Sequence, residues 1–239
     1  MSDKNVTTEK ATESQTVEAA EVKKQQQNRK APTPRRVRPQ LSRPAFRRTL
    51  KLNSLQAQKV INRSFNRVSN SLYSIDVILQ IIGERDQVDQ AEADISALFE
   101  KISDDLLIDI AQARELIATN GIDEMPEYTD PKEYPIEITS PQIAEFARLL
   151  SQLDELMLLV DTLWLNAAFT NRQRKNANYD WQQRLVKLAG RIIGLEKRAR
   201  IAAYNKGKKD EVDLIAPEIE TEDAEIAAAS EEEHGDTKD

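Results

Sequence analysis

The chain contains no cysteine and only one histidine, His234, which lies in the acidic segment EEEHGD. Disulfides and thiolate metal sites are therefore excluded, and catalysis by a cysteine or histidine lacks its residues. No glycine-rich phosphate loop occurs. Asp104, Asp105 and Asp109 fall on one helical face, which is typical of a solvated acidic surface and only rarely of a cation site. We expect no enzyme activity, no metal and no cofactor.

Glycine and aromatic residues are also scarce, with six glycines and 5% aromatics in 239 residues. Together with long runs rich in Leu, Ile, Ala, Glu, Lys and Arg, this composition favours a mainly α protein. The most apolar run, residues 156–169, carries Asp161 and is too short to span a membrane. The first residues lack the apolar core of a signal peptide. We expect a cytoplasmic protein with no membrane partner.

Charge is sorted along the chain, although the net charge is only −7. Residues 22–75 hold 14 Lys or Arg and no acid, whereas residues 76–135 hold 16 acids and four bases. Residues 163–209 are basic again, and residues 210–239 hold 13 acids and one base. A long basic segment without a broad apolar face indicates a partner that is nucleic acid and not a membrane.

Both ends are too polar to join a core. Residues 1–42 become rich in proline and arginine, and we expect a disordered arm whose second half is basic. Residues 208–239 are expected to form a disordered acidic tail. The remaining residues, 43–207, are predicted to form one mainly helical domain for DNA binding and oligomerisation.

Within this domain, apolar residues recur at alternating steps of three and four, which predicts four long helices. Gly83 can end the first helix in a left-handed cap, and Ser140 followed by Pro141 starts the third. Thr170 and Gln173 form a capping box at the start of the fourth. We expect two long helical hairpins that pack at shallow angles as a four-helix core.

Two short segments, 48–52 and 135–139, alternate polar and apolar residues and predict β-strands. Each is followed by a cap and a helix, and the segments LKLNSLQAQ and IEITSPQIA match in pattern at an offset of 86 residues. The same offset carries Gly121 onto Gly207. An internal duplication and a chance similarity of two strand-cap-helix starts are about equally supported.

The stretch 43–67 is read as the nucleic-acid-facing part. Arg47, Thr49 and Lys51 alternate with leucines, so they point outward when the leucines face the core. Ser54 can cap the next helix, and helix starts of this kind bind phosphate. The predicted DNA-binding residues are Arg35, Arg36, Arg38, Arg43, Arg47, Thr49, Lys51, Ser54, Lys59, Arg63 and Arg67.

A second basic surface is predicted at Arg172, Arg174 and Lys175, where balancing acids are few. It either extends the polyanion surface or docks on acidic parts of the chain. The acidic second helix is itself a predicted face for a protein partner. The alternative function is therefore a non-catalytic helical accessory protein that docks on other proteins.

The segments TLKLNSLQAQKVINR and RLLSQLDELMLLVDTLWLNAAFTNRQRKNANYDWQQRLVKLAGRI resemble the AcaB-like family, carried by integrative and conjugative elements and conjugative plasmids. The resemblance covers about residues 46–203. It implies a DNA-binding transcriptional regulator related to ribbon-helix-helix proteins, in which a strand enters the major groove. The implied readers are Arg47, Thr49 and Lys51, with Ser54 at a phosphate. The helices are longer than a minimal ribbon-helix-helix protein needs, and Glu137 stands where a symmetric partner would present a base.

Strand 48–52 can pair with strand 135–139 of the same chain or with its copy in a homodimer. Pairing within one chain is expected to bring Lys51 near Glu137 and to weaken the positive charge of the ribbon. Pairing between chains doubles that charge. The charge argument therefore favours a homodimer.

Overall fold

Two strands and a set of helices make up the part described by this computed structural model, residues 44–83 and 85–217. In chain order these elements are β1 (Phe46–Leu52), α2 (Leu55–Val60), a π-helical turn (Ile61–Phe65), α3 (Asn66–Ile82), α4 (Arg85–Thr119), β2 (Lys132–Ile138), α5 (Pro141–Leu165), α6 (Asn171–Asn205) and α7 (Lys209–Ile215). The prediction of a mainly helical protein with two short strands is confirmed.

The predicted helix boundaries are made by the expected caps. Gly83 adopts a left-handed conformation with φ 74° and donates its N–H to the Leu79 carbonyl. This conformation favours glycine because a Cβ would be strained there. Thr170 and Gln173 form the reciprocal capping box that starts α6. These local signals end and start the helices where the sequence predicts.

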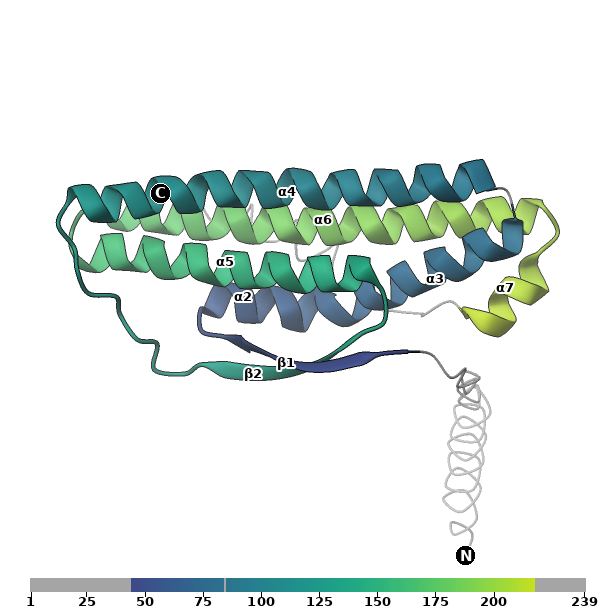
Figure 1. The fold of residues 1–239 in the computed structure, drawn as a ribbon, viewed down its shortest axis with the longest axis horizontal. Helices are drawn as coiled ribbons and strands as arrows, with labels where there is room; N and C mark the ends of the chain where they lie inside the picture. Colours follow the sequence, from purple (N-terminus) through teal and green to yellow (C-terminus); the bar gives the residue numbers. More distant parts are fainter. Residues whose placement is uncertain (1–43, 84, 218–239) are drawn as a thin grey trace, which may run out of the picture. The chain divides into compact units, whose positions relative to one another are not determined.

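The pairing of the helices differs from the prediction. Figure 1 shows the long helices lying alongside one another, with the two strands below α2 and α5. The main helix contacts are between α4 and α5 and between α3 and α6, whereas α3 and α4 touch little. Each helix that was expected to complete its own hairpin therefore packs mostly on the other half of the domain.

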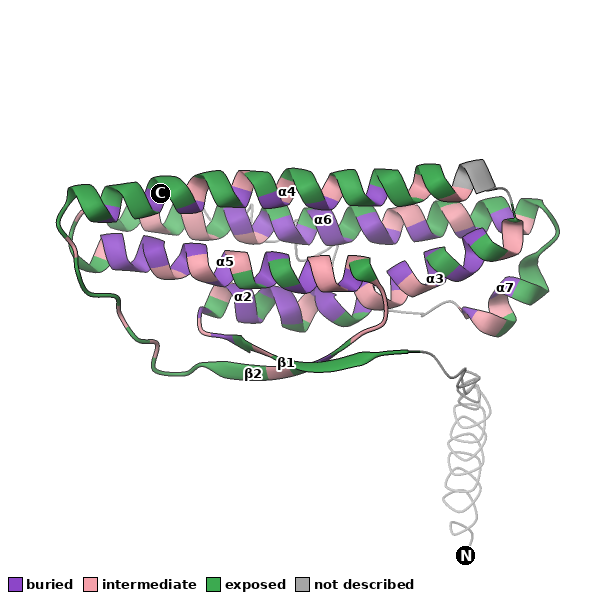
Figure 2. Cartoon of the chain, viewed as in Figure 1, coloured by how far each residue is buried: buried purple, intermediate pink, exposed green. Residues whose placement is uncertain are grey.

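The core lies between these helices. Figure 2 shows buried residues concentrated on the inward faces and exposed residues along the outer face of α4. Phe146, Leu150, Leu153 and Met157 on α5 are completely buried, and the rings of Phe65 and Phe146 stack 6.0 Å apart. The steps of three and four seen in the sequence thus correspond to the buried stripes.

The two halves of the domain repeat at an offset of 86 residues. β1 and β2 coincide at this offset from end to end, as do α4 and α6, which are both 35 residues long. Ser54 and Ser140, also 86 apart, each cap a helix by accepting a backbone N–H from three residues further on. The structure thus favours the internal duplication over chance similarity.

The π-helical turn explains why the first and third helices fall out of register by one residue. Before it, Val60 corresponds to Phe146 at offset 86, and after it Val68 corresponds to Leu153 at offset 85. All four side chains are buried. A π turn accommodates one extra residue in a helix, so the buried stripe continues on both sides of it.

The strands pair within one chain. β1 runs antiparallel to β2, and Thr49, at the centre of β1, faces Pro135, its own equivalent in the repeat. The ribbon therefore has an internal pseudo-twofold arrangement. The predicted pairing of two first strands from separate chains is wrong, because β2 fills that place.

Helix α7 extends the folded part beyond the predicted boundary at residue 208. Val212 and Ala216 are buried, and α7 packs on α3 and α6. Arg200 of α6 donates to the Ala216 carbonyl at 2.7 Å. The sequence places these residues in an acidic tail, but Val212 completes a small second core with Ile78 and Ala203.

Candidate nucleic-acid interface

The outward face of β1 carries the predicted reading residues. Arg47, Thr49 and Lys51 are exposed, whereas Leu52 is completely buried and Leu50 is half-buried. This alternation follows from the twofold period of a strand that lies on a helical core. The three side chains thus share one exposed face of a two-stranded ribbon.

Each base on this face lies opposite an acid. Arg47 donates from Nε to Oε1 of Glu137 at 3.0 Å, and Lys51 stands opposite Glu133. The predicted neighbour of Lys51 was Glu137, but the register gives that acid to Arg47. The four charges cancel across the ribbon. Because the Arg47 side chain is 86% exposed, this ion pair is screened by water and can exchange for another anion.

The prediction that Ser54 holds a phosphate is wrong. It is completely buried, and its N–H and hydroxyl donate to Oδ1 of Asp154 at 2.6 and 2.7 Å. The N–H of Asn53 donates to the same carboxylate at 3.0 Å. Asp154 of α5 therefore occupies the anion position at the start of α2. The sequence feature that could have indicated this contact is Asp154 itself, an aspartate within an otherwise apolar helix.

Arg67 is also withdrawn from the surface. Its side chain is 4% exposed and lies 3.4 Å from Oε2 of Glu196, which also pairs with Arg200 at 2.8 Å. Burial favours such a paired arrangement because an isolated charge would be costly there. Arg67 is thus a core residue, in contrast to Lys59, which is exposed, and Arg63, which is half-buried.

The predicted second basic surface is divided. Arg172 and Lys175 are exposed near the start of α6. Arg174 instead donates to Oδ1 of Asp161 at 2.5 Å and lies over the Trp164 ring, 4.0 Å from its centroid. Arg174 therefore joins helices α5 and α6 and has little freedom to bind a ligand.

Asp161 also accepts a hydrogen bond from Tyr128, at 2.8 Å, and so ties the linker before β2 to α5. Burial, and then this hydrogen bond, raise the pKa of Tyr128 well above its usual value. The phenol therefore remains neutral at physiological pH.

The predicted arm residues Arg35, Arg36, Arg38 and Arg43 lie outside the described residues. Among the described residues, no group of three or more His, Cys, Asp or Glu could hold a metal ion. No helix in the same part of the chain is long and apolar enough to cross a membrane. Asp109 is engaged by the indole N–H of Trp181, at 2.8 Å.

The acidic second helix, α4, which is the predicted face for a protein partner, exposes most of its described acids. Its inner face packs on α5, while six carboxylates are exposed among the α4 side chains that the structure describes. They are Asp89, Glu92, Asp94, Glu100, Asp104 and Glu115.

These features define a mainly helical protein in which two strand-helix-helix units share one antiparallel ribbon. No protein-family model and no curated protein matches the chain. Among solved structures, the chain is similar to the crystal structure of a selenomethionine-containing AcaB from uropathogenic E. coli. The two are 59% identical with a TM-score of 0.76, and the alignment covers 82% of this chain and 100% of that one. The chain belongs to the AcaB-like family, as its resemblance indicates.

Proposed function

We propose that this chain is a DNA-binding transcriptional regulator of conjugative mobile elements, acting in the cytoplasm. The observation that carries the proposal is the two-stranded ribbon with Arg47, Thr49 and Lys51 exposed on one face. A two-stranded ribbon fits the major groove of DNA. There, arginine and lysine donate hydrogen bonds to guanine. Threonine can bond to donors or acceptors of the bases or contact the thymine methyl group. The strand-helix-helix order of each half is that of ribbon-helix-helix proteins.

In this proposal, one chain supplies a complete but asymmetric reading surface. Arg47 and Lys51 of β1 correspond in the repeat to Glu133 and Glu137 of β2. Carboxylates are repelled by phosphate and accept hydrogen bonds only from cytosine or adenine amino groups. We therefore expect a non-palindromic site, read chiefly by β1 and strengthened by the basic arm. The homodimer itself stays a prediction.

The test neutralises the charged side chains of β1 and of β2 in separate variants. Replacing Arg47 and Lys51 together by Gln should remove most of the preference for the specific site, since each good base contact contributes about 1–3 kcal/mol. Replacing Glu133 and Glu137 by Gln should strengthen binding to all duplexes, because it removes two negative charges from the contact face. Competition binding at physiological salt measures both, with Glu92→Gln on α4 as the matched control. Equal binding of specific and random duplex by the wild type would refute the proposal.

The role of the basic arm is tested by the dependence of DNA affinity on salt concentration. Neutralising Arg35, Arg36 and Arg38 should weaken binding to specific and random DNA alike. Each lost phosphate contact should reduce the slope of log K against log salt by about one. An unchanged slope would remove the arm from the interface.

A second candidate function is a helical accessory protein that uses the acidic surface of α4 to dock on conjugation or replication proteins. The six exposed carboxylates favour it, because they form a polyanionic surface beside a core that does not need them. Replacing Glu92, Asp94 and Glu100 by neutral amides should then abolish capture of a defined basic partner, while DNA binding persists. Capture that survives these changes would refute the docking surface.

A further inference from the structure

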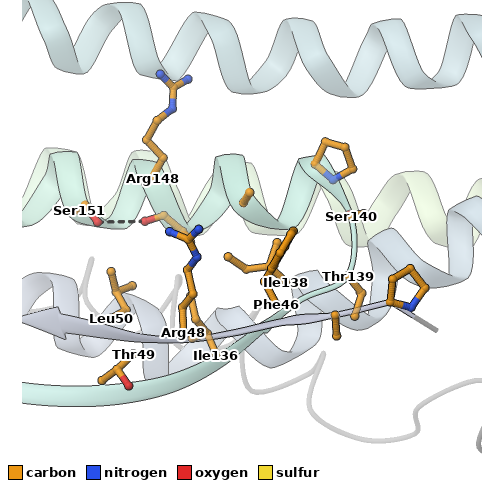
Figure 3. A pocket seen from close by; sticks show the side chains of 15 residues that line it. Phe46, Arg48, Thr49, Leu50, Ile136, Ile138, Thr139, Ser140, Arg148 and Ser151 are labelled. Carbon is orange, nitrogen blue, oxygen red and sulfur yellow. Dashed lines mark hydrogen bonds between the residues drawn. The ribbon is translucent and has the colours of Figure 1, made fainter. Parts of the chain in front are cut away.

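A groove of about 950 Å³ lies between the back of the ribbon and the first turns of α5 (Figure 3). Its walls are mainly apolar, with Phe46 and Leu50 from β1, Ile136 and Ile138 from β2, and alanines from α5. Phe46 is 70% exposed at its edge. A volume in this range suits a small organic ligand.

The other half of the domain is filled at the equivalent place. Ala144 and Ala147, which line the groove, correspond at offset 86 to Gln58 and Ile61, and both of these larger side chains are buried. Gln58 also donates to the Asp130 carbonyl at 3.0 Å, which holds the chain that enters β2. The groove therefore arises from small residues where its counterpart has large ones.

The polar residues that face each other between ribbon and helix also differ between the two halves. In the filled half, Asn62 of the π turn donates to the hydroxyl of Tyr134 on β2 at 3.3 Å. Their equivalents beside the groove are Arg148 and Arg48. Two guanidinium groups cannot hydrogen bond to each other, because arginine has only donors. The hydrogen bond of the filled half therefore has no counterpart beside the groove.

Arg48 is the better placed of the two cations. Figure 3 shows it rising from β1 toward α5, whereas Arg148 turns away from the ribbon. Arg148 donates to Glu145 at 2.5 Å, while no carboxylate of the described residues pairs with Arg48, whose guanidinium lies 6.0 Å from the Phe46 ring centroid. An exposed arginine that has no carboxylate partner among the described residues and stands above apolar walls is complementary to an apolar molecule with one anionic group.

We propose that this groove binds a small amphipathic organic anion, with its apolar body against the ribbon and its carboxylate or sulfonate on Arg48. Arg48, Thr49 and Leu50 are consecutive in β1, so the ligand would lie directly behind a reading residue. Binding itself does not depend on the proposed function. Its consequence, a ligand-dependent change in DNA affinity, rests on that function.

The experiment titrates the full-length protein with 8-anilinonaphthalene-1-sulfonate and follows its fluorescence. We expect saturable binding of one probe per chain. The variant Ala144→Gln/Ala147→Ile, which copies the filled half, should abolish it. Arg48→Gln should weaken it about tenfold, the loss expected for one charge-assisted contact. Lys101→Gln, an exposed change on α4, is the matched control and should leave binding unchanged.

Arg48→Gln keeps the groove open, so it tests the proposal even when the filled variant fails to fold by circular dichroism. Decanoate should displace the probe, and decanol should do so at least about tenfold less well, because only the acid bears charge. The absence of saturable binding would overturn the proposal. This holds even if the groove is closed by the chain's own arm or by a second copy. Equal binding by Arg48→Gln, or equal competition by decanol, would also overturn it. DNA affinity measured without probe separates this outcome from a failure of the proposed function.

Discussion

Residues 46–119 and residues 132–205 follow the same course at an offset of 86, yet their strands carry opposite charges. Arg47 and Lys51 of the first half stand where the second has Glu133 and Glu137. The buried positions keep their period because both halves contribute to one core. The exposed positions are free of that constraint. A ribbon built from two similar units can therefore become an asymmetric surface without a change of fold.

The largest expected effect tests the π turn, which only the first half contains. Deleting Arg148 from the regular helix α5 should turn one part of its buried stripe by about 100° relative to the other, because an α-helix has 3.6 residues per turn. Leu150, Leu153 and Met157 could not then face the core together with Ile143. We expect this variant to lack a cooperative unfolding transition by circular dichroism.

The matched deletion is Asn62, which lies within the π turn and is exposed. Removing it should convert the turn to regular α-helix and give α2 and α3 a single register with α5, with no slip of one residue between them. The buried residues on both sides then stay inward, so stability should change by only about 1 kcal/mol, of the order of the lost hydrogen bond to Tyr134. Similar unfolding of both deletion variants would refute this explanation of the register.

A smaller loss of stability is expected when the buried ion pairs of Glu196 are broken. The carboxylate of these pairs is present in only one of the two halves. Glu196 of α6 pairs with Arg67 and Arg200, whereas its equivalent in α4 is Ile110. Glu196→Ala leaves two buried arginines without this carboxylate and should lower the free energy of unfolding by about 3–5 kcal/mol. Urea denaturation measures the loss.

The control for Glu196 is Glu155→Ala. Glu155 pairs with Arg114, the equivalent of Arg200 in the first half, and the Arg114 side chain is 63% exposed. Removing an exposed pair should cost less than about 1 kcal/mol. Equal losses at Glu196 and Glu155 would contradict the assignment of the Glu196 cluster to the core.

The comparison also explains which features could be predicted from the sequence. The helix ends at Gly83 and Thr170 depend on local backbone hydrogen bonds, so nearby residues reveal them. The partner of each helix does not, because periodicity identifies a buried face but not the helix that covers it. The expected hairpins were therefore paired incorrectly.

The same limit applies to the predicted interface. The alternation around Thr49 revealed which strand face is exposed. Ser54 and Arg67 were assigned to DNA because they lie in a basic stretch, but Asp154 and Glu196, about 100 residues or more away, hold them inside. An ion pair between distant segments leaves no periodic signal. The apolar groove was missed for a related reason, since Ala144 is informative only beside its equivalent Gln58.

The smallest effect concerns the linker before β2, which Tyr128 fastens to Asp161. Tyr128→Phe removes one hydrogen bond, and because Arg174 still pairs with Asp161 we expect a loss of about 1 kcal/mol near neutral pH. Burial and the hydrogen bond raise the pKa of Tyr128 in the folded protein, whereas an unfolded tyrosine ionises near pH 10. Above about pH 10 the unfolded state then binds fewer protons, so the wild type should lose stability as pH rises. The Phe variant lacks this loss, and the two stability curves should converge. Urea denaturation between pH 7 and pH 10.5 measures them, with the exposed Tyr179→Phe as control. Parallel curves for wild type and Tyr128→Phe would show that the Tyr128 phenol does not fasten the linker.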